Sequence, residues 1–486
     1  MTDTPFPSLR ITEDAFLPEG SFAEAQAEYL RPDPAVVEEL DALLSTKKVG
    51  VVAHFYMDPE LQGVLSACTW PHVHISDSLA MADAAIEMVE GGCEHIVVLG
   101  VDFMSENARA MLDAAGYAHV PVYRVAAEPI GCSLAESAEA LTYGAWLHQA
   151  ARAGGKALHV VYINTSLRTK ARSHAVVPTI TCTSSNVVQT ILQAAAQIPD
   201  VRIHFGPDTY MGRNLEALLG RLAEMDDDAV RALHPEHTAD SVRRLLERFD
   251  YFKQGTCIVH HMFGDEVAAR VRRDYEDAYV TAHLEVPGEM FEVALERQAK
   301  DEGVVGSTSN ILGFITRKVE EAVAEGRFGT LRFILGTEAG MITSVVRGVR
   351  RVLQAHPGSG VEAEIVFPVA AEAIAPTEDA ELAVVPGVAS GEGCTVAGGC
   401  ATCPYMKMNS LDALLSVVRR AGAADDDLTP MFPATYDERI QGRTAADLGG
   451  EPILHMRAFQ QTGRLGPELV RDIEGRAARA PAPSPA

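Results

Sequence analysis

The stretch that decides the fold is Val49-Gly-Val-Val-Ala-His54-Phe-Tyr56. A short apolar run that ends in polar side chains is typical of a buried strand in a parallel sheet. A helical stretch follows, then the polar pair Asp77-Ser78, a second helical stretch, and a strand from His95 to Gly100. Strands that alternate with helices in this way predict an α/β fold with parallel sheets.

The same order of strand, polar strand end and hydroxyl-rich helix start occurs three times. The distance from the strand end to the helix start is 24, 22 and 25 residues, for the pairs His54 and Ser78, Tyr162 and Ser184, and His283 and Thr308. Such regular spacing indicates three homologous three-layer α/β/α domains in a pseudo-threefold arrangement around a common centre.

The repeats predict the domain bounds. We expect an N-terminal extension over 1–45, three repeats with two insertions, a C-terminal helical segment that packs back on the core, and a disordered tail. The repeats cover 46–131, 132–256 and 257–402, the insertions about 213–250 and 356–393, the C-terminal segment 403–476 and the tail 477–486.

Composition restricts the class of protein. The chain has 486 residues, 47% hydrophobic and 22% charged, and a net charge of -26. So negative a protein is a poor partner for nucleic acid or an anionic membrane surface. The N-terminus lacks the basic and apolar regions of a secretory signal, and no apolar run approaches a membrane span. Eight cysteines are too few for a disulfide framework, so we expect a cytoplasmic enzyme.

One cysteine or cysteine pair follows each repeat. These are Cys132, Cys257 and the pair Cys400/Cys403, and threefold repetition would bring them together. Three thiolates suit an iron–sulfur cluster with one open iron, or a catalytic zinc with one open position. The residues alone leave three classes open: an enzyme with a Lewis-acid cluster, a zinc lyase or hydrolase, and an iron–sulfur electron carrier. The carrier is disfavoured because it needs no polar pocket.

Polar side chains mark the ends of the predicted strands, where α/β sheets bind ligands. They are His54, Tyr56, Tyr162, Asn164, His283 and Glu285. The clusters at Ser78, Ser184 and Thr308 each open a helix, and a helix N-terminus attracts carboxylate or phosphate. The sequence carries no Walker motif and no Gly-x-Gly-x-x-Gly loop, which argues against a nucleotide.

Taken together, these motifs resemble the quinolinate synthase family. The matching stretches run in the family's order from about residue 49 to 415. They are Ala-His54-Phe-Tyr56, Asp77-Ser78-Leu, Phe103-Met-Ser-Glu, Tyr162-Ile-Asn164, Cys182-Thr-Ser184-Ser-Asn, Gly206-Pro-Asp208, Gly255-Thr-Cys257-Ile-Val-His260, His283-Leu-Glu285, Gly306-Ser-Thr308-Ser, Thr337-Glu338 and Cys403-Pro-Tyr-Met-Lys-Met-Asn.

The resemblance implies an activity and a cofactor. The activity is condensation of iminoaspartate with dihydroxyacetone phosphate to quinolinate, releasing phosphate and two waters, in NAD biosynthesis. An enzyme that oxidises L-aspartate would supply the iminoaspartate. The cofactor is a [4Fe–4S] cluster, whose ligand positions fall on Cys132, Cys257 and Cys403.

The resemblance also implies site residues. The substrate positions fall on His54, Ser78, Tyr162, Asn164, Ser184, His260, His283, Glu285 and Thr308, with Tyr56 near the substrate. Within this set, acid–base roles are expected for Tyr162, His283, Glu285 and Tyr56.

Three departures from the family's pattern stand out. Leu284 replaces a frequent proline, and Thr209 and Gly340 occupy places where the family often has a basic residue. Arg168 or Arg213 is a candidate substitute for the missing positive charge. Cys394 and Cys400 are left over, and we consider them a redox-sensitive pair.

Overall fold

The computed structural model describes residues 5–257, 259–260, 263–368, 384–385, 394–395, 403, 405–423 and 427–479, with only the backbone at Ser21, 384–385 and 394–395. By its internal contacts the chain divides into two compact units. The first contains residues 1–101, 119–130 and 258–432, and the second contains 102–118, 131–257 and 433–486.

The first six residues of the stretch quoted at the outset form an inner strand of a four-stranded parallel sheet in the first unit. The order is β4-β3-β5-β6, with β3 at Val49–His54, β4 at Val73–Ser76, β5 at His95–Leu99 and β6 at Val122–Tyr123. All six residues of β3 are buried, as expected for a strand covered on both faces.

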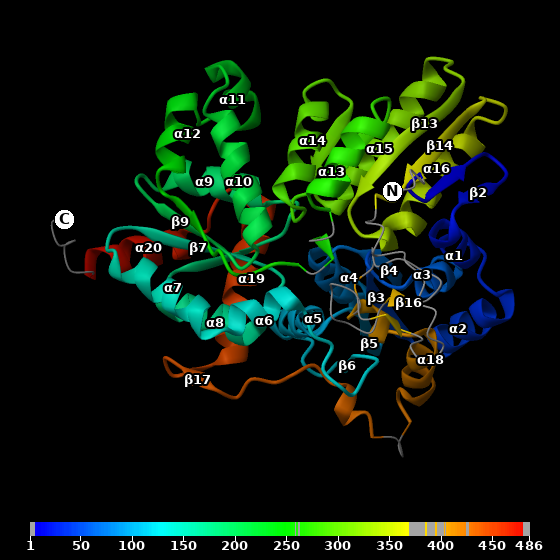
Figure 1. Ribbon diagram of the computed structural model, residues 1–486. Coiled ribbons are helices and arrows are strands. Elements are labelled where there is room, and N and C mark those ends of the chain that lie inside the picture. The colour runs from blue at the N-terminus through cyan, green and yellow to red at the C-terminus, as the bar shows by residue number, and fades with distance from the viewer. Residues whose placement is uncertain are drawn as a thin grey trace. The chain divides into compact units, whose positions relative to one another are not determined.

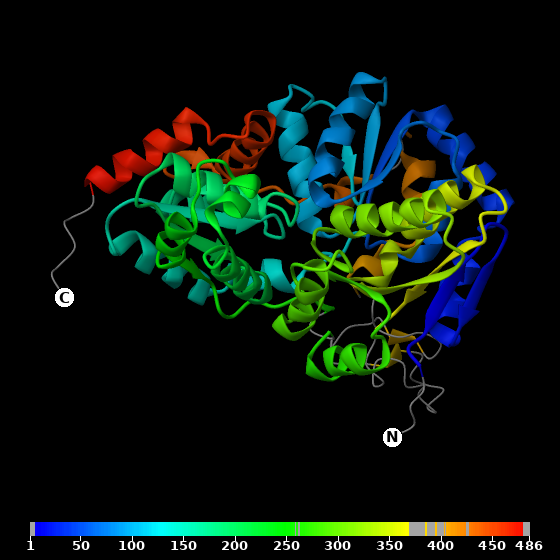
Figure 2. The same ribbon diagram turned by 90° about the horizontal axis from the view of Figure 1, so that it is seen from above.

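A second sheet of the first unit has six strands in the order β12-β11-β13-β14-β1-β2. The first four are parallel: β11 at Tyr279–His283, β12 at Gly303–Gly306, β13 at Gly329–Gly336 and β14 at Val361–Val366. The other two strands are β1 at Ser8–Ile11 and β2 at Phe16–Glu19. β1 runs antiparallel to β14, with Ser8 opposite Val366, and β2 runs antiparallel to β1. Figures 1 and 2 show these blue N-terminal strands beside the yellow β14.

The second unit has a four-stranded parallel sheet in the order β10-β9-β7-β8. Its strands are β7 at Ala157–Tyr162, β8 at Thr179–Cys182, β9 at Arg202–Gly206 and β10 at Phe249–Tyr251. Helix α8, Leu167–Val176, connects β7 to β8 and packs against α19, Ala445–Thr462. The C-terminal helices, red in Figure 2, therefore cover part of this unit.

Helices connect the strands throughout. In the first unit these are α1 Ser21–Tyr29, α2 Pro34–Lys47, α3 Pro59–Ala67, α4 Ser78–Glu90, α13 Asp265–Asp274, α14 Gly288–Gln298, α15 Thr308–Ala324, α16 Ile342–Ala355 and α18 Leu411–Arg420. Besides α8 and α19, the second has α5 Asp102–Ala114, α6 Ser133–Glu139, α7 Leu141–Arg152, α9 Val187–Gln197, α10 Thr209–Leu222, α11 Asp227–Leu233, α12 Ala239–Leu246 and α20 Pro467–Arg479.

Capping side chains set the first residues of two helices that carry predicted site residues. Asp77 caps α4, accepting hydrogen bonds from the backbone N–H groups of Leu79 and Ala80. Ser307 caps α15 in a reciprocal capping box with Asn310. Each such cap stabilises a helix by about 1 kcal/mol. The caps fix the helix starts that carry Ser78 and Thr308.

The α/β class predicted from the sequence is confirmed, and three parallel arrays of strands fall within the three predicted repeats. The pseudo-threefold arrangement and the exact domain bounds stay predictions. Residues 1–45, predicted as an extension, supply β1 and β2, and the predicted insertion 356–393 includes β14. The predicted insertion 213–250 contains most of α10 with α11 and α12. Among the described residues, no helix is both long and apolar enough to cross a membrane.

Candidate active site

His54 ends β3 and is 7% exposed. Its Nδ1 accepts a hydrogen bond of 3.2 Å from the backbone N–H of Tyr56, whose ring packs edge-on against the imidazole. Burial lowers the pKa of His54 to about 4, although the charges of Asp77 and Glu285 oppose the shift. The neutral imidazole must then carry its proton on Nε2, because Nδ1 is the acceptor.

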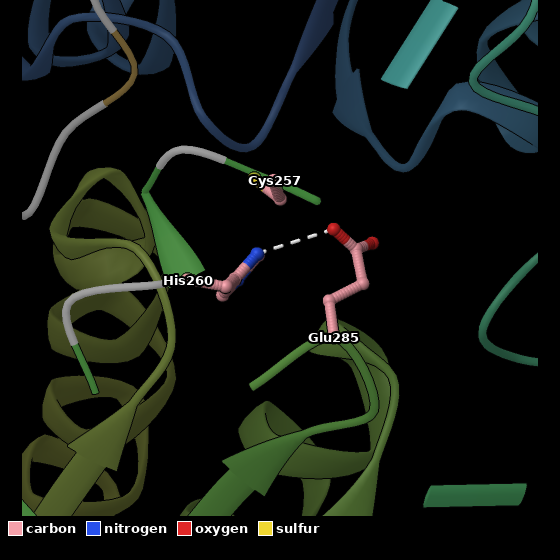
Figure 3. A group of neighbouring side chains, drawn as sticks. All are labelled: Cys257, His260 and Glu285. Carbon is pink, nitrogen blue, oxygen red and sulfur yellow. Dashed lines mark ion pairs between the residues drawn. The ribbon is translucent and has the colours of Figure 1, made fainter. Parts of the chain in front are cut away.

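A buried carboxylate lies between two imidazoles at the end of β11. Glu285 Oε2 is 3.1 Å from His260 Nδ1, and Glu285 Oε1 is 3.6 Å from His283 Nδ1. The two imidazoles stack with their centroids 5.2 Å apart. Figure 3 shows the His260–Glu285 pair with Cys257, at which the chain passes from the second unit into the first. His260, His283 and Glu285 are all at most 3% exposed, so bulk water screens this cluster poorly.

His283 has the same chemistry as His54. Its Nδ1 accepts a hydrogen bond of 3.3 Å from the Glu285 backbone N–H. Burial lowers the pKa of His283 to about 4, and the charge of Glu285 opposes this shift. Both strand-end histidines are therefore neutral at physiological pH, with Nε2 as the donor.

The end of β13 adds two residues that the sequence-based site did not include. Thr337 Oγ1 lies 3.0 Å from the hydroxyl oxygen of Tyr56. Glu338 is 1% exposed, and burial followed by the charge of Glu285 raises its pKa well above the usual range. Both residues follow a predicted strand end, the same signal that pointed to His54 and His283.

Ser78 and Thr308 are the first residues of α4 and α15 and are both buried. Their position at helix N-termini suits a carboxylate or a phosphate. In the second unit, Tyr162 ends β7 and is 5% exposed, Asn164 lies in the loop after it, and Ser184 comes shortly before α9. The predicted substrate residues thus form two groups, one in each unit.

Two of the three predicted ligand cysteines lie on loops that contact each other within the second unit. Ser133 Oγ donates a hydrogen bond of 3.0 Å to the carbonyl oxygen of Thr256. Ser133 directly follows Cys132, and Thr256 directly precedes Cys257. Both thiols are partly exposed. The hydrogen bond therefore joins the two segments that carry the thiols.

Gly255 brings the Cys257 segment close to the start of α10. The Gly255 carbonyl accepts from the Thr209 N–H at 2.7 Å, and the Gly255 N–H donates to Thr209 Oγ1 at 3.0 Å. A Cβ atom at 255 would stand 2.2 Å from the Pro207 carbonyl oxygen, so only glycine fits. Thr209, one of the departures from the family's pattern, thus anchors the loop that carries Cys257.

Cys403, the third predicted ligand, is partly exposed in the first unit. Its carbonyl accepts a hydrogen bond of 3.4 Å from the Lys407 N–H. Burial lowers the pKa of Lys407, while the charges of Asp58, Glu338 and Cys403 oppose the shift. The proposed Cys394/Cys400 pair lies outside the side chains that the structure describes.

The remaining departures concern positive charge. A Cβ atom at Gly340 would stand 3.1 Å from the carbonyl oxygens of Phe55 and Met57. A lysine or arginine there would press on the backbone that follows His54. Arg168, suggested as a substitute, forms an ion pair of 2.5 Å with Glu139. Arg213, the other suggestion, is exposed on α10.

Comparison with known proteins now decides the family. A family model described as Quinolinate synthetase A protein matches residues 38–359. The chain belongs to the quinolinate synthase family. It is 53% identical over 481 residues to a chloroplastic quinolinate synthase from Nicotiana tabacum, covering 96% of this chain and 66% of that one. The corresponding protein from Arabidopsis thaliana is 52% identical, covering 96% and 67%.

A more distant relative from Cyanothece sp. is 28% identical over 302 residues, covering 61% of this chain and 70% of the relative. The chain spans about two thirds of the length of the two plant relatives. The predicted family and the prediction of a quinolinate synthase enzyme of NAD biosynthesis are confirmed. The cytoplasmic location predicted from the sequence was wrong, because the plant relatives are chloroplastic proteins.

Membership of the family implies a metal–sulfur cofactor and small-molecule substrates. The donor set fits such a cofactor, because thiolates are the soft ligands that iron–sulfur clusters and zinc prefer. The joined Cys132 and Cys257 segments also fit it.

Proposed function

We propose that this member of the quinolinate synthase family condenses iminoaspartate with dihydroxyacetone phosphate to quinolinate, releasing phosphate and two waters. The observation that carries the proposal is the buried Glu285 between His260 and His283. A carboxylate beside two imidazoles can move protons between carbon and oxygen atoms of a substrate, as dehydration and ring closure require.

Cys132, Cys257 and Cys403 are the ligands that we propose for a [4Fe–4S] cluster. When bound, such a cluster supplies an open iron that acts as a Lewis acid toward substrate oxygens. The Ser133–Thr256 hydrogen bond supports Cys132 and Cys257 as a pair. The alternative hypothesis is a zinc lyase or hydrolase that uses the same thiols. The metal content of the purified protein distinguishes the iron–sulfur enzyme from the zinc enzyme. An electron carrier is not supported, because the relatives are enzymes.

The chain's own residues would bind the anionic substrates. We propose that Ser78, Thr308 and Ser184, at or near helix starts, hold the carboxylates of iminoaspartate and the phosphate of the triose. Asn164 adds an amide that can donate to or accept from a substrate oxygen.

Five side chains are assigned to proton transfer or to hydrogen bonds with the reacting oxygens. The neutral His54 and His283 present Nε2–H groups, because each Nδ1 accepts a backbone N–H. We propose that they donate hydrogen bonds to carbonyl or carboxylate oxygens of the substrate. Glu285, with its oxygens beside His260 and His283, is assigned as the base. Tyr162 and Tyr56 are assigned as proton donors, and the hydroxyl of Tyr56 is held by Thr337.

The experiment is a reconstitution without oxygen. The purified chain is mixed with dihydroxyacetone phosphate and with iminoaspartate generated by an L-aspartate-oxidising enzyme, the partner that the reaction requires. Quinolinate and phosphate should form in equal amounts, and the protein should hold about four irons per chain. A colourless protein with one zinc and no quinolinate would contradict the proposal.

A further inference from the structure

A buried lysine lies directly behind the loop that carries Asn164. Lys170 belongs to α8, is fully buried, and donates hydrogen bonds from Nζ to the carbonyl oxygens of Ile163, at 3.1 Å, and Thr165. These two carbonyls stand on either side of Asn164 in the chain. One nitrogen atom thus fixes the backbone before and after a predicted substrate residue.

The rest of the loop is held just as closely. Thr165 Oγ1 donates to the Tyr162 carbonyl at 3.1 Å, and the Thr165 N–H donates to the Ile163 carbonyl at 2.7 Å. Ser166 caps α8 by accepting from the Thr169 N–H. In the part of the chain that the structure describes, the Asn164 side chain makes no hydrogen bond, which leaves its amide available to a ligand.

A carboxylate supports the lysine. Glu106 on α5 accepts a hydrogen bond of 2.9 Å from the Leu167 N–H and one of 2.8 Å from the Tyr436 hydroxyl. Burial lowers the Lys170 pKa, and the charge of Glu106 opposes this shift by favouring the protonated form. A neutral amine still has two N–H donors, which is enough for the two carbonyls.

Burial of a lysine is costly unless its donors are used, and an apolar side chain of similar volume is often equally or more stable when only packing is needed. Lys170 uses its donors on one short loop and on no other carbonyl among the described residues. The loop begins directly after Tyr162, the last residue of β7, and carries Asn164.

We propose that Lys170 is a positioning residue of the enzyme, which holds the carbonyls of Ile163 and Thr165 so that Asn164 and Tyr162 meet the substrate in one fixed geometry. This proposal rests on the proposed function, in which Asn164 and Tyr162 bind substrate. Lys170 itself acts through the loop.

The test compares Lys170→Met, Asn164→Ala and the double variant, each loaded with iron and assayed well below its unfolding temperature. Lys170→Met keeps the volume and removes both hydrogen bonds, so kcat/KM for quinolinate formation should fall by about 10-fold to 100-fold, because a small misplacement of substrate-binding groups can cost up to about 100-fold in rate. Because Lys170 acts through the loop that carries Asn164, the loss in the double variant should be smaller than the product of the two single losses.

Leu219→Ala is the control for lost stability. Leu219 is buried in α10 of the same unit and is not part of the loop. This variant should lower the unfolding temperature but leave kcat/KM of the folded enzyme unchanged. If Lys170→Met is too unstable, Tyr436→Phe replaces it: loss of the hydrogen bond to Glu106 should lower kcat/KM severalfold without loss of iron.

The outcomes separate the two proposals. A wild-type chain that forms no quinolinate, or an Asn164→Ala variant with full activity, overturns the proposed site. An impaired Asn164→Ala together with a folded Lys170→Met of wild-type kcat/KM overturns the role of Lys170 alone. So does a double variant in which the two losses simply multiply. If Lys170→Met does not fold, wild-type kcat/KM in Tyr436→Phe overturns it.

Discussion

The Ser133 hydroxyl donates a hydrogen bond of 3.0 Å to the Thr256 carbonyl, although 123 residues separate them in the chain. Each of these residues is the immediate neighbour of a cysteine that the family's pattern marks as a ligand. The contact lies within one unit and joins two thiol-bearing segments, as the metal site that we propose requires.

The first prediction concerns the segment before Cys257. Gly255→Ala places a Cβ atom 2.2 Å from the Pro207 carbonyl oxygen, so the segment must move although every thiol remains. We expect the iron content per chain to fall by about half or more, because ligand geometry sets cluster affinity. Iron and sulfide analysis of the anaerobically purified variant measures this. Gly220→Ala, with open space around its Cβ atom, should keep the full iron content, and equal loss in both variants would argue against the specific effect.

The second prediction concerns the buried carboxylate. Glu285→Gln keeps the shape of the side chain but removes its charge and basicity. We expect normal iron content and a decrease in kcat of about 100-fold or more, the range for loss of a general base. Steady-state quinolinate formation gives kcat. Glu292→Gln, exposed on α14, serves as the control. Near-normal turnover of Glu285→Gln would remove Glu285 from the chemistry.

The third prediction concerns pH and stability. Burial, followed by the charges of His204 and His174, lowers the pKa of His159 to about 3. An unfolded histidine titrates near 6.5, so the unfolded chain binds more protons between these values. The stabilising contribution is complete above pH 6.5 and is lost as the pH falls toward 3, with a slope of up to about 1.4 kcal/mol per pH unit.

Denaturant unfolding of wild type and His159→Gln at pH 6.5, 5.5 and 4.5 checks this. Glutamine does not titrate, so the free energy of unfolding of the variant should fall less steeply with decreasing pH. The comparison uses slopes, because loss of the 2.8 Å contact with the Tyr143 hydroxyl lowers stability at every pH. Parallel curves would contradict the neutral state of His159.

The fourth prediction concerns a missing basic residue. Gly340→Lys restores the residue type that the family often has, but its Cβ atom would press on the carbonyls of Phe55 and Met57. We expect a loss of about 1–3 kcal/mol in the free energy of unfolding, typical of overpacking, and no gain in activity. Gly313→Lys, on open surface of α15, should change stability little. A stable and more active Gly340→Lys would show that the backbone after His54 adapts.

Part of this site could be read from the sequence. His54, Tyr162 and His283 each end an apolar run in the sequence and a strand in the structure. The carboxyl ends of parallel strands carry ligand sites, so the sequence pattern alone was enough to predict these three as site residues. Ser78 and Thr308 were recognisable as helix starts by the Asp and Ser that precede them.

The rest depends on contacts between distant residues. No sequence pattern near Ser8 indicates that it pairs with Val366. Residues 1–45 were therefore predicted to be an extension outside the sheets. Lys170 resembles any helical lysine until the fold buries it against Ile163 and Thr165. The approach of Gly340 to Phe55 was likewise hidden, and the sequence showed only a departure from the family's pattern.

The central claim is that three thiols hold the cofactor of a quinolinate-forming enzyme. The most direct measurement is iron content and quinolinate formation, without oxygen, for Cys132→Ala, Cys257→Ala and Cys403→Ala, with Cys93→Ala, a buried thiol outside the proposed ligand set, as the control. The account predicts about four irons and activity in wild type and Cys93→Ala, and loss of both iron and activity in each of the other three. A full cluster and normal quinolinate formation in any of those three would contradict it.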